Sequence, residues 1–244
     1  LAFGKGSSLR IDEAKCFEKI NDFISNHRNR YIFSLLSYDL KNDIESLSAN
    51  NSDVTNFPQA ILWSPEFVVS IKESSIEYIQ GIKNNKHQEF ISCFVEKKHT
   101  STVRESVCFE PRTSKENYLK TVNHLKKHIQ RGDIYEVNYC QEYVSYNTDI
   151  KDVICTYVNL NNTTKAPFSS LFCFEEFTIF SCSPERFIKK NDLHLLTQPI
   201  KGTARRGKND TEDRLLIDNL KNDPKERSEN IMIVDLMRND LSKL

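Results

Sequence analysis

The sequence feature that most constrains the fold is a β-rich stretch over residues 168–199. Three runs of alternating aromatic and β-branched residues fill this stretch, and turn-forming residues such as Lys190, Asn191 and Asp192 separate them. Short runs of this kind, joined by tight turns, are typical of antiparallel strands. The second half of the chain is therefore predicted to contain antiparallel hairpins.

Helical patterns surround that stretch. Thr113 and Glu116 form a Thr-x-x-Glu capping box before a helix that reaches about residue 130, where Gly132 and Asp133 stop it. Pro224 stands at a favoured first helical position. Apolar spacing predicts further helices at 11–27, within 84–106 (followed there by a surface connection), at 150–160 and at 211–222, and strands at 31–38, 61–71, 75–80 and 134–146. Antiparallel strands mixed with helices, without regular alternation, predict the α+β class.

Charge and cysteine usage exclude several classes of protein. Thirty-four basic residues balance thirty-four acidic ones, so no global field attracts nucleic acid or an anionic membrane. No apolar run approaches the roughly 20 residues that span a bilayer, and no signal-peptide pattern opens the chain. Seven scattered cysteines without a Cys-x-x-Cys pair indicate reduced thiols in the cytoplasm, and their spacing gives no reason to expect a zinc site.

Lys201 and Glu185 are the first candidates for chemistry. Lys201 ends an apolar strand just before Gly202 and Thr203, where a partly desolvated amine could act as a nucleophile or base. Paired strands would set Glu185 near Lys201 at one sheet end, as an acid and base couple. Two plainer alternatives remain open here: a solvated lysine at a strand end, and an edge-strand ion pair of Glu185 with Arg186 or Lys189.

Glu226 and Glu229 are the second pair of candidates. They lie three residues apart, so both carboxylates project from one face of a helix. Hard oxygen ligands of this kind suit Mg²⁺. The alternative is an acidic first helical turn that complements the helix dipole.

The order and spacing of these groups resemble the chorismate-utilising family, which includes anthranilate, aminodeoxychorismate, isochorismate and salicylate synthases. The matching segments run along nearly the whole chain: YDLKN (38–42), GDIYEVN (132–138), APFS (166–169), SPERF (183–187), PIKGT (199–203) and ENIMIVDLMRNDL (229–241). The resemblance implies the N-terminal part of the anthranilate synthase component I-like fold, with large, mostly antiparallel sheets and flanking helices.

The resemblance also implies a role for each matched residue. Lys201 would add to the chorismate ring as the C4 hydroxyl leaves, and Glu185 would protonate that hydroxyl. Gly202 and Thr203 would lie against the substrate, and Glu226 with Glu229 would form half of a Mg²⁺ site. Ammonia would come from a glutamine amidotransferase partner and enter at C4, giving 4-amino-4-deoxychorismate for para-aminobenzoate and folate biosynthesis.

Two positions indicate the branch of the family. Anthranilate synthases typically carry Ala where this chain has Lys201, whereas aminodeoxychorismate synthases carry Lys. Isochorismate-forming relatives use a Lys to activate water in the segment that aligns with Glu136, so the acidic residue disfavours water addition. Aminodeoxychorismate synthase component I is the favoured interpretation. The alternatives are anthranilate synthase component I, a non-catalytic module that docks an amidotransferase, and an unrelated structural α+β protein.

The resemblance implies that residues 1–244 form one incomplete chorismate-binding domain, with an N-terminal subregion (1–110) and the first part of the catalytic region (111–244). In relatives, a C-terminal half follows the Arg-Asn-Asp motif, here Arg238 to Asp240. That half supplies a substrate-facing His, a carboxylate-binding Arg and the remaining glutamates of the metal site. We therefore expect this polypeptide, taken alone, to be inactive.

Overall fold

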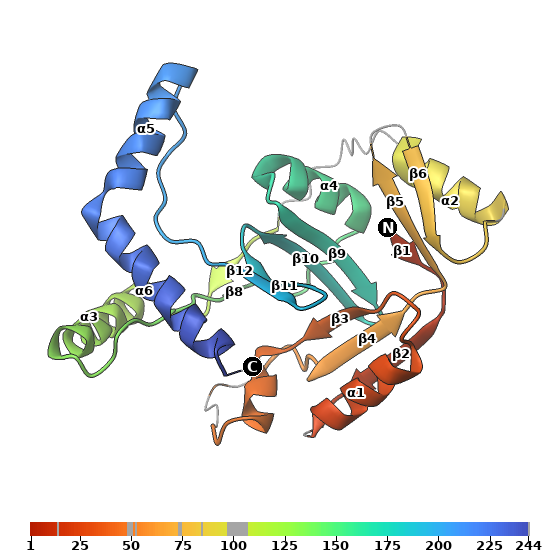
Figure 1. Cartoon of the computed structure of the whole chain (residues 1–244), viewed down its shortest axis with the longest axis horizontal. Helices are drawn as coiled ribbons and strands as arrows, with labels where there is room; N and C mark the ends of the chain where they lie inside the picture. The colour runs from red at the N-terminus through yellow and green to blue at the C-terminus, as the bar shows by residue number, and fades with distance from the viewer. Residues whose placement is uncertain are drawn as a thin grey trace. The chain divides into compact units, whose positions relative to one another are not determined.

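The structure is a computed structural model that describes residues 1–13, 15–47, 51, 53–72, 75–83, 85–96 and 107–243, without the side chains of 86, 90 and 93–96. The chain divides into two compact units, Leu1–Lys97 and Lys98–Leu244. Figure 1 shows their helices and strands, and each unit is described by itself. The predicted α+β class is confirmed, since both units combine antiparallel strands with helices. The grouping of residues 1–244 into one domain stays a prediction.

The described part of the first unit forms two antiparallel sheets, with strand orders β2-β4-β3 and β1-β5-β6. Its elements are β1 (Ala2–Phe3), β2 (Ser7–Ile11), α1 (Cys16–Asn26), β3 (Phe33–Leu36), the 3₁₀ helix η1 (Tyr38–Asp43), β4 (Ala60–Ser64), β5 (Phe67–Lys72), β6 (Ser75–Gln80) and α2 (Asn85–Glu96). The predicted strands at 31–38, 61–71 and 75–80 are confirmed as β3 to β6, with the middle run split into β4 and β5. The connection predicted after α2 falls on residues outside the described ones.

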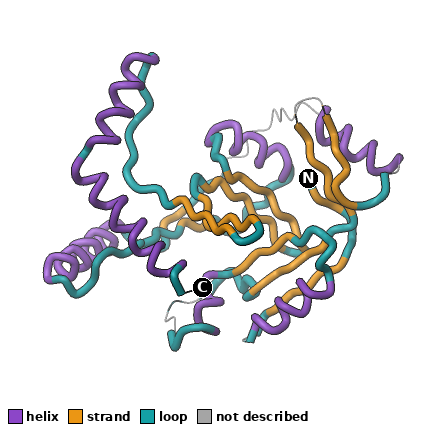
Figure 2. Tube along the Cα trace, in the orientation of Figure 1, coloured by secondary structure: helices purple, strands orange, loops and turns teal. Residues whose placement is uncertain are grey.

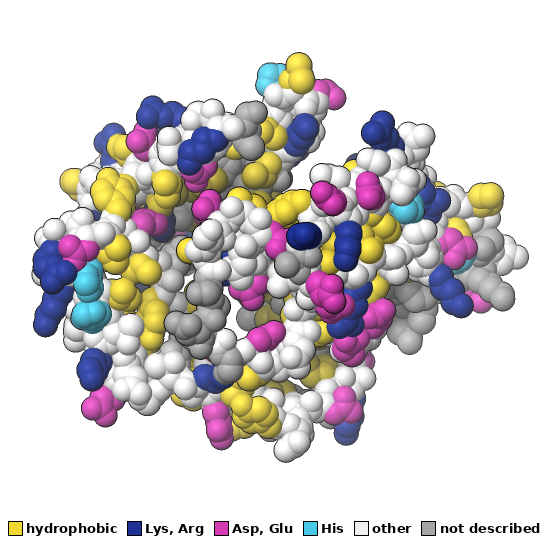
Figure 3. Space-filling view, turned by 90° about the horizontal axis from the view of Figure 1, so that it is seen from below, with side chains coloured by type: hydrophobic (Ala, Val, Ile, Leu, Met, Phe, Trp, Pro, Cys, Tyr) yellow, Lys and Arg dark blue, Asp and Glu magenta, His cyan; other side chains and the backbone are white. Residues whose placement is uncertain are grey.

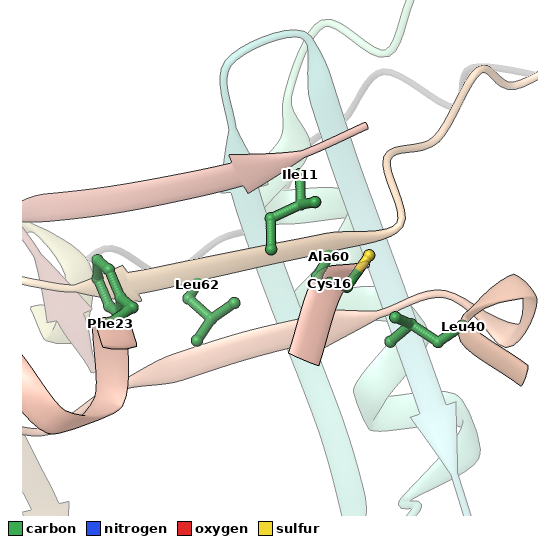
Figure 4. Close-up of a cluster of buried hydrophobic side chains, with 6 residues drawn as sticks. All are labelled: Ile11, Cys16, Phe23, Leu40, Ala60 and Leu62. Carbon is green, nitrogen blue, oxygen red and sulfur yellow. The ribbon is translucent and has the colours of Figure 1, made fainter. Parts of the chain in front are cut away.

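The core of this unit lies between α1 and the central strand β4 (Figure 4). Six side chains form it: Ile11, Cys16, Phe23, Leu40, Ala60 and Leu62. Leu62 is 1% exposed, because β3 and β2 pair with β4 on both sides and α1 covers it. The carboxylate of Asp43 accepts a hydrogen bond from the Cys16 backbone N–H at 2.8 Å, which joins the start of α1 to the end of η1.

The helix predicted over residues 11–27 is too long at its start. Ile11 is the last residue of β2 and pairs with Ala60, and α1 begins only at Cys16. Lys15, with φ at 67°, turns the chain between them. The apolar side chain of Ile11 fits a helical stripe and a strand facing the core equally well, so spacing alone did not separate the two.

The described part of the second unit consists of β-hairpins and long helices (Figure 2). Its elements are β7 (Glu110–Pro111), α3 (Lys115–Arg131), β8 (Tyr143–Val144), α4 (Val153–Thr164), β9 (Phe168–Phe174), β10 (Phe177–Ser183), β11 (Arg186–Asn191), β12 (His194–Gln198), α5 (Asp210–Asn222) and α6 (Pro224–Leu241). The β structure predicted over 168–199 is confirmed, but its three predicted runs are four strands, which form the antiparallel hairpins β9-β10 and β11-β12; α4 packs against β10.

Two local predictions in this unit were wrong. The N-cap of α3 is Ser114, whose hydroxyl accepts from the Asn117 backbone N–H at 3.2 Å, so Thr113 forms no capping box. Only Tyr143–Val144 of the strand predicted over 134–146 pairs, with β7. The preceding residues form a loop, which the Gln141 side chain fixes by donating to the Thr113 carbonyl at 2.9 Å.

The surface carries both signs of charge. Figure 3 shows acidic and basic side chains interspersed on the visible face, in agreement with the balanced composition. Within the part of the chain that the structure describes, no helix has the length and apolar character needed to cross a bilayer. Every cysteine whose side chain is described carries a free thiol.

We expect Leu62→Ala to destabilise the first unit by about 2–5 kcal/mol, because the truncation leaves a cavity between α1 and β4. Trp63, the only tryptophan, is the next residue of β4, so urea unfolding followed by its fluorescence reports on this unit. Leu36→Ala is the matched control, since Leu36 is 57% exposed on β3 and should change stability by about 0.5 kcal/mol or less. Equal losses in the two variants would contradict this core.

Candidate functional site

The β11-β12 hairpin brings Glu185 and Lys201 to the same end of a two-stranded sheet, as predicted. Arg186 pairs with Gln198, so Glu185 lies beside the residues that follow β12. Its Oε1 accepts a hydrogen bond from the backbone N–H of Ile200 at 2.8 Å. The side chain of Arg186 donates to Gln198 at 2.9 Å. The carboxylate of Glu185 therefore fixes the backbone one residue before Lys201.

The ion pair of Lys201 is with a different carboxylate. Its Nζ lies 3.6 Å from Oε1 of Glu136, and each of the two side chains is 29% exposed. Glu136 comes from the loop after α3, and that loop is the segment predicted to be a strand. As a regular strand it would alternate its side chains between two faces. As a loop it turns Glu136 towards the end of β12.

A cavity of about 450 Å³ opens at this point of the second unit. Four charged residues contribute to its wall: Glu136, Glu185, Arg186 and Lys201. Helix α6 supplies an apolar side with Ile233, Leu236 and Met237. A cavity that combines an amine, a guanidinium, two carboxylates and an apolar wall suits a small ligand with both polar and apolar parts.

Lys201 also lines a second cavity, of about 440 Å³, whose wall includes Glu226 and Asn230 of α6. Gly202, the residue after Lys201, has φ at +78°, and a Cβ there would lie 2.5 Å from Oε2 of Glu226. Its positive φ favours glycine, and the absence of a side chain leaves room for the Glu226 carboxylate. Thr203 is exposed just beyond it. The turn thus brings Lys201 and Glu226 to one place.

Glu226 and Glu229 are linked through one cation. The Nζ of Lys225 lies 3.6 Å from Oε1 of Glu226 and 3.2 Å from Oε1 of Glu229. Both carboxylates raise the pKa of Lys225, and Glu229 has the larger effect. The two carboxylates face different cavities, since Glu229 lines a third one with Tyr135. Among the described residues, no group of three or more His, Cys, Asp or Glu could hold a metal. The pair therefore fits Mg²⁺ in ligand type, but it supplies at most two of the oxygens that the ion requires.

The segment after Thr203 is anchored to the start of α5. Arg206 binds Asp213 through both Nε and Nη2, and the Gly207 backbone N–H donates to the same carboxylate at 2.7 Å. Two hydrogen bonds lower the pKa of Asp213 to about 2: the larger effect comes from the Arg206 side chain and the smaller from the Gly207 N–H. A Cβ on Gly207 would lie 2.2 Å from the Asp213 nitrogen, so this residue must be glycine.

Two components of the site were not predicted. Glu136 was noted only as a residue that disfavours water addition, although an acidic residue in place of a basic one is itself a signal for pairing with a lysine. In the sequence, the apolar side chains of α6 look like those of any helix, and nothing marks them as part of a site. Only their position beside the β11-β12 hairpin assigns them to the cavity.

Comparison with known proteins supplies the relatives of this chain. A family model described as chorismate binding enzyme matches residues 3–244. The chain is 38% identical over 131 residues to aminodeoxychorismate synthase component 1 of Klebsiella aerogenes. This alignment covers 54% of the chain and 29% of the Klebsiella protein. It is 30% identical over 212 residues to an anthranilate synthase component I-like protein of Synechocystis, covering 86% of this chain and 44% of that protein.

A solved structure supports the fold. The crystal structure of anthranilate synthase component I from Streptococcus pneumoniae superposes with a TM-score of 0.77 at 18% identity, over 100% of this chain and 61% of that one. At this identity the match shows the fold alone, and it confirms antiparallel sheets with helices. The matched region spans less than two thirds of each of these three relatives.

We expect the turn at residues 205–213 to weaken between about pH 4 and pH 2. Because the pKa of Asp213 falls in the folded chain from 3.8 to about 2, its contribution to stability is fully present above the unfolded-state value. That contribution disappears as the pH drops through the folded-state value. Hydrogen-exchange protection of the Gly207 amide should decrease over this range.

Asp213→Asn should reduce this protection at neutral pH and remove its acid dependence. Asp218→Asn, on the exposed side of the same helix, is the control and should behave as the wild type. Acid-independent protection of the Gly207 amide in the wild type would contradict the role assigned to Asp213.

Proposed function

The chain belongs to the chorismate binding enzyme family, and from this premise we propose that it is part of an aminodeoxychorismate synthase component I. The observation that carries the proposal is the amine of Lys201 in the wall of a cavity that also contains Glu185 and Glu136. The sequence resemblance separates this branch from anthranilate synthases by that lysine. The identity of 38% to the Klebsiella aminodeoxychorismate synthase component 1 supports the same branch.

In the proposed reaction, the neutral amine of Lys201 attacks the ring of chorismate. A bond forms between Nζ and a ring carbon, the ring double bond shifts, and the C4–oxygen bond breaks. The leaving hydroxyl takes a proton from Glu185 and departs as water. Ammonia then forms a bond at C4 and the bond to Nζ breaks, which restores the free lysine. A covalent adduct of this kind divides one difficult substitution into two easier steps.

The contacts of Glu185 are compatible with the acid role. Its Oε1 is held by the Ile200 N–H, so the proton would be carried on Oε2. That hydrogen bond fixes the carboxyl group on the same backbone segment as Lys201. The proposed acid is therefore held next to the residue that carries the nucleophile, which suits proton transfer to the group that leaves.

We assign Glu136 as a positioning residue for Lys201. Its carboxylate holds the lysine ammonium before reaction, and it is the group placed to receive the proton that the amine must lose. A partly exposed ion pair of this type contributes at most about 1 kcal/mol. Its main effect is to restrict the long lysine side chain to the cavity wall.

We propose that Glu226 and Glu229 contribute two ligands to a Mg²⁺ site, with the rest from water, substrate or other parts of the protein. Bound there, the ion would neutralise a substrate carboxylate. Lys225 would first have to leave the two glutamates, because its ammonium now lies near both carboxylates. The two carboxylates line different cavities, so they would also have to turn towards one ion. The contact of Gly202 with Glu226 would place this ion next to the turn that carries Lys201.

The proposed partner is a glutamine amidotransferase that supplies ammonia, and the proposed location is the cytoplasm, where free thiols persist. Anthranilate synthase component I is the second candidate. The Synechocystis relative, described as anthranilate synthase component I-like, favours it because it aligns with 86% of this chain. The two candidates differ in the carbon that receives the amine, so the product distinguishes them.

Product analysis tests the proposal directly. The protein expressed from its complete reading frame is supplied with chorismate, Mg²⁺ and ammonium, and the products are separated by chromatography. We expect 4-amino-4-deoxychorismate. Anthranilate would overturn the choice of branch, and unreacted chorismate would favour a module that docks an amidotransferase without chemistry.

Replacing Lys201 tests the nucleophile. Lys201→Arg keeps the positive charge beside Glu136 but forms no adduct, so kcat should fall by about 10²–10⁴-fold, the range seen when a reacting group is lost. Lys189→Arg, on the exposed part of β11, is the matched control and should keep full activity. Full activity of Lys201→Arg would show that the lysine acts only through its charge.

Glu136→Gln tests the positioning role. We expect kcat to fall by a few-fold to about tenfold with little change in KM for chorismate, because the substitution loosens the amine without altering the cavity. Glu142→Gln is the control from the same loop, where Glu142 pairs with Arg112 at 2.8 Å. A rise in KM alone would assign Glu136 to substrate binding instead.

A further inference from the structure

The C-terminal half of α3 presents two histidines to each other. His124 and His128 are four residues apart, so their side chains lie on one face of the helix. The Nε2 atoms of the two rings are 3.0 Å apart, and the ring planes meet at 81°. This juxtaposition lies outside the cavities around Lys201, and nothing in the proposed reaction uses it.

A carboxylate fixes the tautomer of one ring. The Nδ1 of His128 lies 2.7 Å from Oδ2 of Asp133, and Arg131 binds the same carboxylate through Nε at 3.0 Å. An ionised carboxylate only accepts hydrogen bonds, so Nδ1 of His128 carries the proton. In the neutral ring its Nε2 therefore holds a lone pair, which accepts a hydrogen bond from Nε2 of His124 at 3.0 Å. Metal-binding histidines are oriented by such carboxylates in the same way.

The helix end holds this arrangement in place. Gly132 has φ at 79° and its N–H donates to the carbonyls of His128 and Ile129. The Asp133 backbone N–H donates to the His128 carbonyl at 3.0 Å. This left-handed glycine turn folds the chain back, and it places the Asp133 side chain against the imidazole. The Asp133 carboxylate and the His128 imidazole are thus held together by local backbone geometry, and His124 contacts this pair through His128.

We propose that His124 and His128 form a binding site for a divalent ion of the Zn²⁺, Ni²⁺ or Cu²⁺ type, with both Nε2 atoms as ligands. A tetrahedral ion about 2.0–2.1 Å from each nitrogen separates the two nitrogens by about 3.4 Å. The observed 3.0 Å has to open by only a few tenths of an ångström. Before the metal can bind His124, the proton between the two Nε2 atoms has to leave Nε2 of His124, whose ring then carries its proton on Nδ1.

The ligands select the class of metal. Imidazole nitrogens suit Zn²⁺, Ni²⁺ and Cu²⁺, whereas Mg²⁺ prefers oxygen. The site is therefore chemically separate from the pair Glu226 and Glu229. It supplies two protein ligands, and water fills the remaining positions, since the His128 side chain is 31% exposed. Asp133 acts through its hydrogen bond to His128 and does not contact the metal.

The test is isothermal titration of the metal-free protein with ZnCl₂ and NiCl₂, with MgCl₂ for comparison. We expect the wild type to bind Zn²⁺ and Ni²⁺ at one site. The control variant His194→Asn, changed at the exposed start of β12, should bind both ions as the wild type does. His124→Asn and His128→Asn should each weaken binding by at least about tenfold. Asp133→Asn should weaken it by about 10–100-fold, as other changes to such supporting carboxylates do.

Unchanged binding in the double variant His124→Asn/His128→Asn would overturn the site, and so would an equal loss in His194→Asn. Circular dichroism of each variant checks that α3 still forms. A measurement on the wild type alone avoids folding effects. Imidazole nitrogen NMR should show both Nε2 signals shifting on addition of Zn²⁺, with Nδ1 of His128 remaining protonated. Shifts confined to other histidines would contradict the proposal.

Discussion

The candidate site depends on one hydrogen bond, from the Ile200 backbone N–H to the Glu185 carboxylate. It continues the β11-β12 ladder beyond the last paired residues, Arg186 and Gln198, and it does so with a side chain. The chain after β12 is thereby held beside the chain before β11. Lys201 can then present its amine to a cavity while Gly202 turns sharply towards α6. Without this contact, the backbone before Lys201 would lose its hydrogen bond to the chain before β11.

Helix α6 is the second component on which the site depends, and its contacts within the described structure are few. None of its residues is buried, and Ile231, Val234 and Leu236 are between 48% and 63% exposed. Its polar face still has a defined role, since Asp223 caps it and Glu226 touches Gly202. The helix therefore combines an apolar wall for the cavity with one carboxylate, that of Glu226, placed at the Lys201 turn.

Much of this architecture could be predicted from the sequence. Alternation over residues 168–199 gave both hairpins, and Pro224 and Gly132 marked a helix start and a helix end correctly. The prediction failed where two structures share one pattern. Ile11 suits a strand or a helix, and the loop at 134–142 has the composition of a strand. In both places pairing with a distant segment decided the outcome, and spacing along the chain contains no information about such partners.

For the site, the sequence by itself determined the residue types: a lysine before a glycine turn, a glutamate just before the hairpin that this lysine follows, and two glutamates on one helical turn. These follow from local rules of strands, turns and helices, so they can be read from the sequence. Only the tertiary structure decided the pairing. In the structure, Lys201 forms an ion pair with Glu136, and Glu185 accepts a hydrogen bond from a backbone N–H. Lys225 lies within ion-pair distance of both Glu226 and Glu229. The physical reason is that long charged side chains bind whichever opposite charge or backbone group the fold brings within reach, and that depends on loop conformation and helix position.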